Sequence, residues 1–405
     1  MIGANECSQQ TCSFKDEGDS FHFWVYSGQH VLNQFSAFDS KMMALAIQLA
    51  KRGQYTTSPN PNVGCVIVDK NNDIVGQGWH HKAGTPHAEV HALQQAGTKS
   101  LGATAYVTLE PCSHFGRTPP CANALIDAGV TRVVAAMVDP NPLVAGSGLA
   151  KLAQAGIATA HGLLQAQAEQ LNRGFIKRMQ TGRPWVTVKL AASLDGKTAL
   201  ANGQSKWITG PLARQDVQRH RAQSCAILSG SGTVMADNPS LNVRYTELGL
   251  DRAVLSEDAL RQPLKVILDG RNQLTPDLHC LQSDSPALLI NSQNNPLPFF
   301  SNVSQWQAPY DANQLDLNAV FDYLGSLQLN HIWVEAGAKL AGALLQSKLI
   351  DELILYQAPK LMGNTGQDLF AIEPLTSMQQ AYTLNWTDIR QVGSDLKLSA
   401  KIVYN

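Results

Sequence analysis

Three residues in the first half of the chain have the types and spacing of a metal site. His87 lies in the segment PHAEVHAL, Cys112 follows the segment TLEP, and Cys121 comes nine positions after Cys112. One imidazole and two thiolates are ligands that zinc accepts, and three protein ligands leave the fourth tetrahedral position for water. Zinc lowers the pKa of such a water to about 7, so the pattern predicts a hydrolytic metal centre.

Glu89 stands two residues after His87, where its carboxylate can move a proton from that water to a leaving amine. The order H-x-E followed by P-C and a second Cys is typical of zinc-dependent nucleobase deaminases. A zinc protease needs H-E-x-x-H instead, with the Glu directly after the first His. His91 is therefore not expected to be a metal ligand.

Alternating strand and helix patterns must position these residues. Buried strands are expected over 63–69 and 103–111, and the helix HAEVHALQQAG between them carries His87 and Glu89 at its start. The first helix of the chain is expected to begin at an N-cap near Asp39. Further strand and helix patterns continue to about residue 180, and a single sheet covered by helices on both faces is the expected packing.

The pattern restarts after Thr181-Gly182-Arg183-Pro184. The strands expected there are PWVTVKLAASLDG with its turn, CAILSGSGTV running into a glycine loop, PLKVILDG, PALLIN, HIWVEAG and ELILYQAPKL. The sequence therefore predicts three parts, with boundaries near residues 37 and 182. These are a poorly ordered extension over 1–37, a zinc-dependent deaminase domain over 38–182 and a second α/β domain over 183–405.

Composition narrows the class of protein. The 405 residues include 31 basic and 32 acidic side chains, for a net charge of −1, and this balance argues against a general nucleic-acid binder. No run of about 18 apolar residues is present to span a membrane. The N-terminus lacks the basic start and apolar core of a secretory signal, and seven cysteines do not suit a disulfide scaffold. We expect a soluble cytoplasmic enzyme.

Four segments make residues 38–405 resemble the bifunctional deaminase/reductase family of riboflavin biosynthesis: PNPNVGCVIV, GQGWHHKAGTPHAEVHAL, TAYVTLEPCSHFGRTPPC and VKLAASLDGKTA. The SHFGRTPP insert between the two cysteines distinguishes this family from deaminases that use the short C-x-x-C. The resemblance implies an α/β chain with a cytidine-deaminase-like three-layer domain and a dihydrofolate-reductase-like domain. It also implies a homo-oligomer, either a dimer or a tetramer.

The resemblance implies two reactions and two cofactors, zinc and NADPH. The first is hydrolytic deamination of 2,5-diamino-6-(5-phosphoribosylamino)pyrimidin-4(3H)-one. The second is reduction of the ribosyl side chain of 5-amino-6-(5-phosphoribosylamino)uracil to ribityl. No nucleic-acid or membrane partner is implied.

The resemblance also implies roles for residues of the first half. His87, Cys112 and Cys121 are implied as zinc ligands, with Glu89 as the proton donor. The residues implied to line the substrate pocket are Asn60, His80, His114 and Arg117. Arg117 has a physical rationale, because a guanidinium can hold a phosphate with two donors.

In the second half, no G-x-G-x-x-G follows the first strand, so a Rossmann fingerprint is absent. Two strands run into small-residue turns, at Gly230 and Gly232 and at Gly337 and Gly342. Helix starts there can hold a dinucleotide phosphate, and tight packing of strand on helix is the other interpretation.

The resemblance implies two sets of residues in this half. The set facing NADPH is Ala191, Trp207, Thr233, Asp237, Gly337, Ala338, Lys339, Leu340, Ala341, Gly342 and Ala343. The set facing the substrate is Ser205, Arg221, Leu241, Arg244 and Glu335. Arg221 and Arg244 are interpreted as a clamp on the 5′-phosphate.

Three alternatives remain open at this point. The first is that only one half of the chain is active. The second is that the chain is a nucleic-acid deaminase whose second half is an RNA-binding module. The latter predicts a basic stripe or stacking aromatics, whereas aromatic residues make up only 7% of the chain. The third is an inactive scaffold with structural zinc, for which His114 is the nearest candidate for a fourth ligand.

Overall fold

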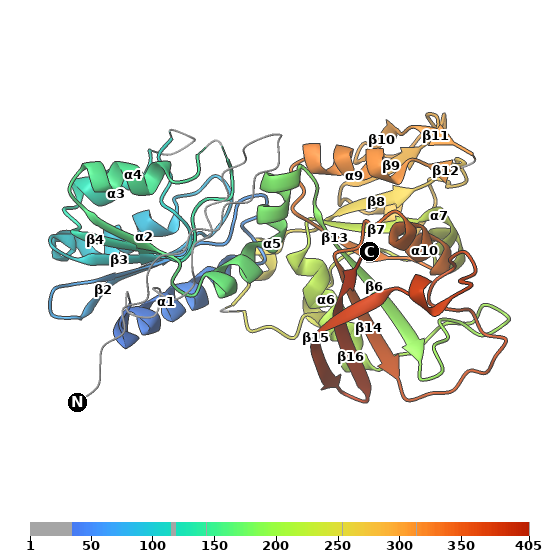
Figure 1. Cartoon of the computed structure of the whole chain (residues 1–405). Helices are drawn as coiled ribbons and strands as arrows, with labels where there is room; N and C mark the ends of the chain where they lie inside the picture. Colours follow the sequence, from blue (N-terminus) through green and yellow to red (C-terminus); the bar gives the residue numbers. More distant parts are fainter. Residues whose placement is uncertain (1–34, 115–118, 143, 253, 313, 405) are drawn as a thin grey trace, which may run out of the picture.

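The computed structural model describes residues 35–404 apart from 115–118, 143, 253 and 313. Figure 1 shows two sheets side by side, each covered by helices, with α5 (Gln165–Thr181) between them. The extension expected over 1–37 lies outside the described residues except for its last three positions.

The first sheet has the strand order β2-β1-β3-β4-β5. Its strands are β1 (Gly64–Val68), β2 (Ile74–Trp79), β3 (Thr104–Val107), β4 (Arg132–Ala135) and β5 (Ala158–His161). β1 pairs antiparallel with β2 and β3, while β3, β4 and β5 run parallel. All of β1 is buried, as expected for a strand with helices on both faces.

Helices cover both faces of this sheet. One face packs against α2 (Ala88–Ala96), α3 (Cys121–Asp127) and α4 (Ser147–Gln154). The other packs against α1 (Ala37–Ala50) and α5. Adjacent residues of β1 fall in opposite cores, because side chains alternate along a strand. The three-layer arrangement expected from the sequence is confirmed.

The first helix starts earlier than the predicted N-cap near Asp39. Ser36 is the N-cap, and its Oγ accepts a hydrogen bond from the backbone N of Asp39 at 3.0 Å. Asp39 completes a capping box, because its Oδ2 accepts from the backbone N of Ser36 at 2.8 Å. Its Oδ1 accepts from Arg132 Nη1 at 2.7 Å and from Tyr106 OH at 2.6 Å. Asp39 therefore ties α1 to β3 and β4.

The second sheet has the strand order β10-β9-β8-β7-β13-β6-β14-β16-β15. Its strands are β6 (Trp185–Ser193), β7 (Ala226–Gly230), β8 (Leu264–Leu268), β9 (Ala287–Asn291), β10 (Val303–Gln307), β13 (His331–Glu335), β14 (Glu352–Ala358), β15 (Thr383–Val392) and β16 (Asp395–Val403). The strands from β10 to β14 are parallel, and β16 and β15 then add antiparallel. This mixed sheet forms the second α/β domain expected from the sequence.

Helices also pack on both faces of the second sheet. α6 (Pro211–Gln223), α7 (Ser231–Asp237) and the short α8 (His279–Gln282) contribute to the core on one face. α9 (Leu317–Ser326) and α10 (Ala338–Gln346) contribute to the core on the other. Within the described part of the chain, no helix combines the length and apolar character needed to cross a membrane.

Helix α5 contacts both halves of the molecule. Its residue Ala168 is buried in the first core, and Ile176 packs against that core. Arg173 makes a bidentate ion pair with Glu352 of β14, with both N–O distances 2.7 Å. Because both side chains are largely buried, this pair fixes the helix against the second sheet.

Replacing Asp39 with Asn is expected to destabilise the fold by about 1–3 kcal/mol at pH 7, because hydrogen bonds to a charged group are lost. Burial opposes ionisation, but hydrogen bonds from Arg132, Tyr106 and Ser36 outweigh it and hold the pKa of the Asp39 carboxyl below its ordinary range. A carboxyl with a lowered folded pKa stabilises above its unfolded pKa of about 3.9 and loses that contribution as the pH falls.

Thermal unfolding of Asp39→Asn and wild type between pH 7 and pH 3 measures this contribution. The difference in stability is expected to shrink below about pH 4. The exposed Asp73, changed to Asn, is the control and should follow wild type throughout. A difference for Asp39→Asn that does not change with pH would contradict the assignment.

Candidate active site

Three elements of the first half bring the predicted metal ligands together. His87 is the N-cap of α2, Cys121 is the first residue of α3, and Cys112 lies in the loop after β3. His87 Nδ1 lies 3.3 Å from Cys121 Sγ and 3.7 Å from Cys112 Sγ. All three donor atoms lie within 4.8 Å of one another. Ligands at zinc bond lengths of about 2.0–2.3 Å have such separations.

The chemistry of this group fits zinc. A hydrogen bond from Cys121 lowers the pKa of the Cys112 thiol. Burial opposes this effect, and a hydrogen bond with His87 adds to it. A thiolate is the form that binds a metal. His114 is exposed and does not belong to the group of donor atoms found among the described residues. Three protein donors leave a coordination position for water, the feature of a catalytic rather than a structural site.

Glu89 lies in the first turn of α2, two residues after His87. Its side chain is buried, with the residue only 3% exposed, and its Oε2 has no hydrogen-bond partner among the described residues. Burial raises the pKa of the Glu89 carboxyl to about 7. A carboxyl with this pKa can both take up and release a proton near neutral pH.

Asn60 and His80 form a hydrogen-bonded pair beside His87. Burial lowers the pKa of His80 to about 4, so the ring is neutral and carries one N–H. Nδ1 of His80 donates to the Pro86 carbonyl at 3.2 Å, and Nε2 therefore accepts from Asn60 Nδ2 at 3.1 Å. The rings of His80 and His87 meet edge to face at 5.3 Å. Oδ1 of Asn60 has no donor among the described residues.

The two other residues predicted to line the substrate pocket are His114 and Arg117. His114 is exposed at the end of the described part of the loop after Cys112. Arg117 lies outside the described residues, so its proposed contact with phosphate stays a prediction.

The predicted cofactor residues of the second half gather at one edge of its sheet. Gly337, the N-cap of α10, donates from its backbone N to Thr233 Oγ1 of α7 at 3.2 Å. These helices follow β13 and β7, which are neighbouring parallel strands, so their N-termini lie at the same edge. Ala191 lies near the corresponding end of β6, Asp237 ends α7, and Ser205 and Trp207 lie in the loop between β6 and α6.

Arg221 and Arg244, the predicted phosphate clamp, each form an ion pair with a glutamate. Arg221 Nε and Nη2 donate to the two oxygens of Glu335 at 2.6 and 2.8 Å, and its Nη1 donates to the Asn242 carbonyl at 2.9 Å. Burial alone would raise the pKa of Glu335, but Arg221 outweighs it and lowers the pKa to about 2. Arg244 is exposed and pairs with Glu247 at 2.5 Å. Leu241, between the arginines in sequence, is buried.

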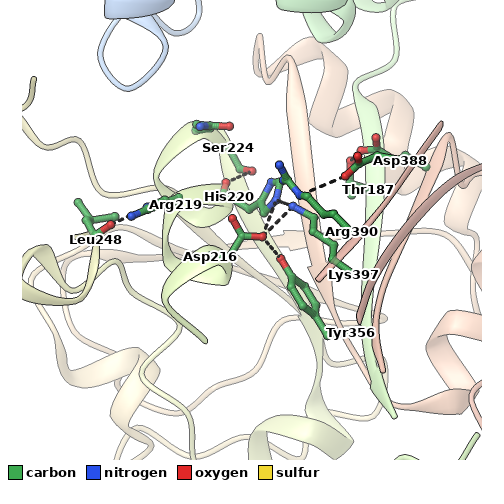
Figure 2. Close-up of polar contacts among 12 residues, drawn as sticks. Thr187, Asp216, Arg219, His220, Ser224, Leu248, Tyr356, Asp388, Arg390 and Lys397 are labelled. Atoms are coloured by element: carbon green, nitrogen blue, oxygen red, sulfur yellow. Dashed lines mark hydrogen bonds and ion pairs between the residues drawn. The ribbon is translucent and has the colours of Figure 1, made fainter. Parts of the chain in front are cut away.

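Figure 2 shows what holds α6, the helix that carries Arg221. Oδ2 of Asp216 accepts hydrogen bonds from Tyr356 OH at 2.6 Å and from Lys397 Nζ at 2.7 Å. Lys397 Nζ also donates to His220 Nε2 at 2.6 Å. The His220 ring stacks on Trp333 of β13, with centroids 4.8 Å apart. This largely buried network fixes α6 against β13, β14 and β16.

The sequence interpretation missed Lys189, which lies beside the Arg221–Glu335 ion pair. Burial lowers the pKa of Lys189, and the nearby Glu335 opposes that effect. The available signal was a lysine in the middle of an otherwise apolar strand, in WVTVKLAAS.

Comparison with known proteins identifies matching families for both halves. Residues 36–137 match the family described as "Cytidine and deoxycytidylate deaminase zinc-binding region". Residues 184–398 match the family described as "RibD C-terminal domain".

Similarity extends over most of the chain. The riboflavin biosynthesis protein RibD of Escherichia coli is 53% identical over 361 residues, which cover 89% of this chain and 98% of that protein. RibD of Haemophilus influenzae is 51% identical over 367 residues, covering 90% and 98%. The solved structure of Acinetobacter baumannii RibD, form 1, has a TM-score of 0.83 and 44% identity, covering 91% of this chain and 99% of that one. A deaminase/reductase from Thermotoga maritima has a TM-score of 0.79 and 31% identity, covering 90% and 98%.

The pairing of Arg221 with Glu335 predicts a compensating pair of variants. Arg221→Met leaves the largely shielded Glu335 carboxylate without its partner and is expected to cost about 2–4 kcal/mol. Changing both residues, to Met and Gln, should recover most of the lost stability. Thermal unfolding of both variants tests this, and a double variant no more stable than Arg221→Met would contradict it.

Proposed function

Since this chain belongs to the RibD family of bifunctional riboflavin-biosynthesis enzymes, we propose that His87, Cys112 and Cys121 hold its catalytic zinc and that Glu89 moves the protons. The enzyme deaminates 2,5-diamino-6-(5-phosphoribosylamino)pyrimidin-4(3H)-one. It then reduces the ribosyl side chain of 5-amino-6-(5-phosphoribosylamino)uracil with NADPH. The observation that carries the residue assignment is the grouping of three metal donors beside the buried, unpaired Oε2 of Glu89.

Each residue of the first site has a separate task. When bound, zinc supplies a Lewis acid that makes water a nucleophile at neutral pH. Glu89 takes the proton that the water loses and gives it to the departing amine, so its carboxyl returns to its starting state. A pKa of about 7 suits both transfers, because neither protonation state is strongly favoured.

Asn60 is proposed to orient the pyrimidine. Its Nδ2 is engaged by the neutral ring of His80, which leaves Oδ1 as a hydrogen-bond acceptor. An acceptor at this position suits an N–H of the diaminopyrimidine. His114 and Arg117 are proposed to contact the rest of the phosphorylated substrate.

In the second site, NADPH supplies the hydride, and the protein supplies orientation. Backbone N–H groups at the N-terminus of α10, in the 337–343 segment, are proposed to hold the cofactor phosphates. Ala191, Trp207, Thr233 and Asp237 are proposed to complete the cofactor site. Ser205, Leu241, Arg244 and the Arg221–Glu335 pair are proposed to face the sugar phosphate.

The alternatives raised by the sequence are resolved by the family. Both halves belong to an enzyme of two activities, so neither an RNA-binding second half nor an inactive scaffold describes the chain. The substrates are small phosphorylated pyrimidines. We place the enzyme in the cytoplasm, where a reducing environment keeps the thiols of Cys112 and Cys121 free for zinc.

We also propose that the chain forms a homo-oligomer through β15. This edge strand of the second sheet carries Trp386 and Ile389, which are 55% and 57% exposed. Long edge strands with exposed apolar residues pair readily with another chain. Analytical ultracentrifugation of wild type and Trp386→Lys tests this, and identical sedimentation would refute the proposed interface.

Mass spectrometry of the products tests the proposed function as a whole. Incubating the diaminopyrimidine substrate with zinc-loaded protein is expected to add about 1 Da, because an amine is replaced by oxygen. Adding NADPH should add about 2 Da more. No change without NADPH would overturn the assignment of the first site. The first shift alone would overturn that of the second.

Glu89→Gln is expected to lower deamination about 100-fold or more, because the amide cannot accept a proton. Zinc content should stay at the wild-type level, since Glu89 is not a ligand. Cys121→Ser, which removes a ligand, is the matched control and should lose zinc as well as activity. Wild-type deamination by zinc-loaded Glu89→Gln would contradict the proposed role.

A further inference from the structure

Residues 55–62, called the seam loop here, lie between the two halves of the molecule. The loop leads into β1 and carries Asn60, whose amide pairs with His80 beside His87. A cavity of about 730 Å³ lies along the seam and is lined by residues of both halves, among them Asn60 and His331. Because the cavity leaves space beside the seam loop, the position of the loop depends on its contacts with the rest of the protein.

The first contact is apolar. Tyr55 is only 3% exposed, and it lies in a cluster whose other buried members all belong to the second half: Ala222, Val243, Leu248 and Leu255. Its OH also accepts a hydrogen bond from Gln223 Nε2 at 3.4 Å. One end of the seam loop is therefore anchored in the second half of the chain.

The second contact reaches the residue next to Asn60. Nδ2 of Asn330, which directly precedes β13, donates to the Pro59 carbonyl at 2.8 Å. The orientation of the Asn330 amide is fixed, because its Oδ1 accepts from Arg178 Nε of α5 at 2.6 Å. Ser58 also contacts Cys225 of the second half, with Oγ and Sγ 2.9 Å apart.

The third contact holds the far end of the loop. Asn172 interrupts the helical geometry of α5, and its side chain pairs with both backbone groups of Asn62. Asn62 N donates to Asn172 Oδ1 at 2.7 Å, and Asn172 Nδ2 donates to the Asn62 carbonyl at 2.9 Å. Gly174, two residues further along α5, allows close approach of Asn330, because a Cβ there would lie 2.5 Å from the Asn330 carbonyl.

We propose that Asn330, a residue of the reductase half, is a positioning residue for deamination. By holding the Pro59 carbonyl, it sets the backbone from which Asn60 presents its amide to the pyrimidine. This inference rests on the role proposed above for Asn60. It assigns to the second half an indirect part, through Asn60, in substrate binding by the first.

The sharpest test is Asn330→Asp in the full-length zinc-loaded enzyme. The carboxylate keeps an acceptor for Arg178 but cannot donate to the Pro59 carbonyl. We expect the KM of deamination to rise about tenfold, as for the loss of one well-placed hydrogen bond, with kcat changed much less. Zinc content should match wild type, as should NADPH-dependent reduction of the supplied deaminated intermediate.

Two further variants control for structural damage. Lys177→Met removes an ion pair between α5 and Asp351 that does not touch the seam loop, and it should leave the KM of deamination unchanged. Arg178→Met removes the donor that orients the Asn330 amide. It should raise the same KM by a smaller factor, and it tests the proposal if Asn330→Asp does not fold.

A double-mutant cycle with Asn60→Ala separates positioning from general destabilisation. If Asn330 acts through Asn60, Asn330→Asp should have no further effect on KM in the Asn60→Ala background. Calorimetric binding of the diaminopyrimidine substrate to the same variants carrying Glu89→Gln should give the same pattern without turnover.

The outcomes distinguish the inference from the function on which it rests. A wild-type KM for folded Asn330→Asp overturns the role of Asn330 and leaves that of Asn60 intact. The same follows if Asn330→Asp changes KM equally in the wild-type and Asn60→Ala backgrounds. A wild-type KM for Asn60→Ala overturns the proposed role of Asn60 and this inference with it.

Discussion

The relative placement of the two halves depends on one helix that packs against both sheets. Helix α5 buries Ala168 against the first sheet and places Arg173 in a bidentate ion pair with Glu352 of the second. Rotation or sliding of the helix would separate two largely buried charges, which is costly in a medium of low dielectric constant. Electrostatics therefore fixes how the halves are placed, and the contacts of the seam loop follow from that placement.

Two glutamates show how surroundings set the chemistry of each half. Glu89 has an oxygen with no partner, and burial raises the pKa of its carboxyl to about 7. Glu335 is mostly shielded from solvent, with 16% of its side chain exposed. Arg221 and Trp333 donate to it, and its pKa is lowered to about 2. The first can exchange protons at neutral pH, whereas the second stays ionised beside Arg221.

The metal group could be predicted from sequence because its ligands stand at ends of elements with strong patterns, in PHAE and in LEPC. The pairing of Arg221 with Glu335 could not, since 114 positions separate them and only the sheet brings them together. Helix α9 was missed, although Asp316 caps it, and β15 was missed because most of its side chains are exposed. Asn172 and Asn330 gave no signal, because a lone asparagine becomes informative only through tertiary contacts.

The burial of Tyr55 bears on whether the two activities can exist as separate proteins. A gene split near residue 182 would release a first half with an unsheltered aromatic ring, and a second half with an open pocket of Val243, Leu248 and Leu255. Each half would then expose apolar side chains that the fused chain keeps covered. Once such a contact has evolved, fusion becomes hard to reverse, because each partner would need compensating surface changes before independence.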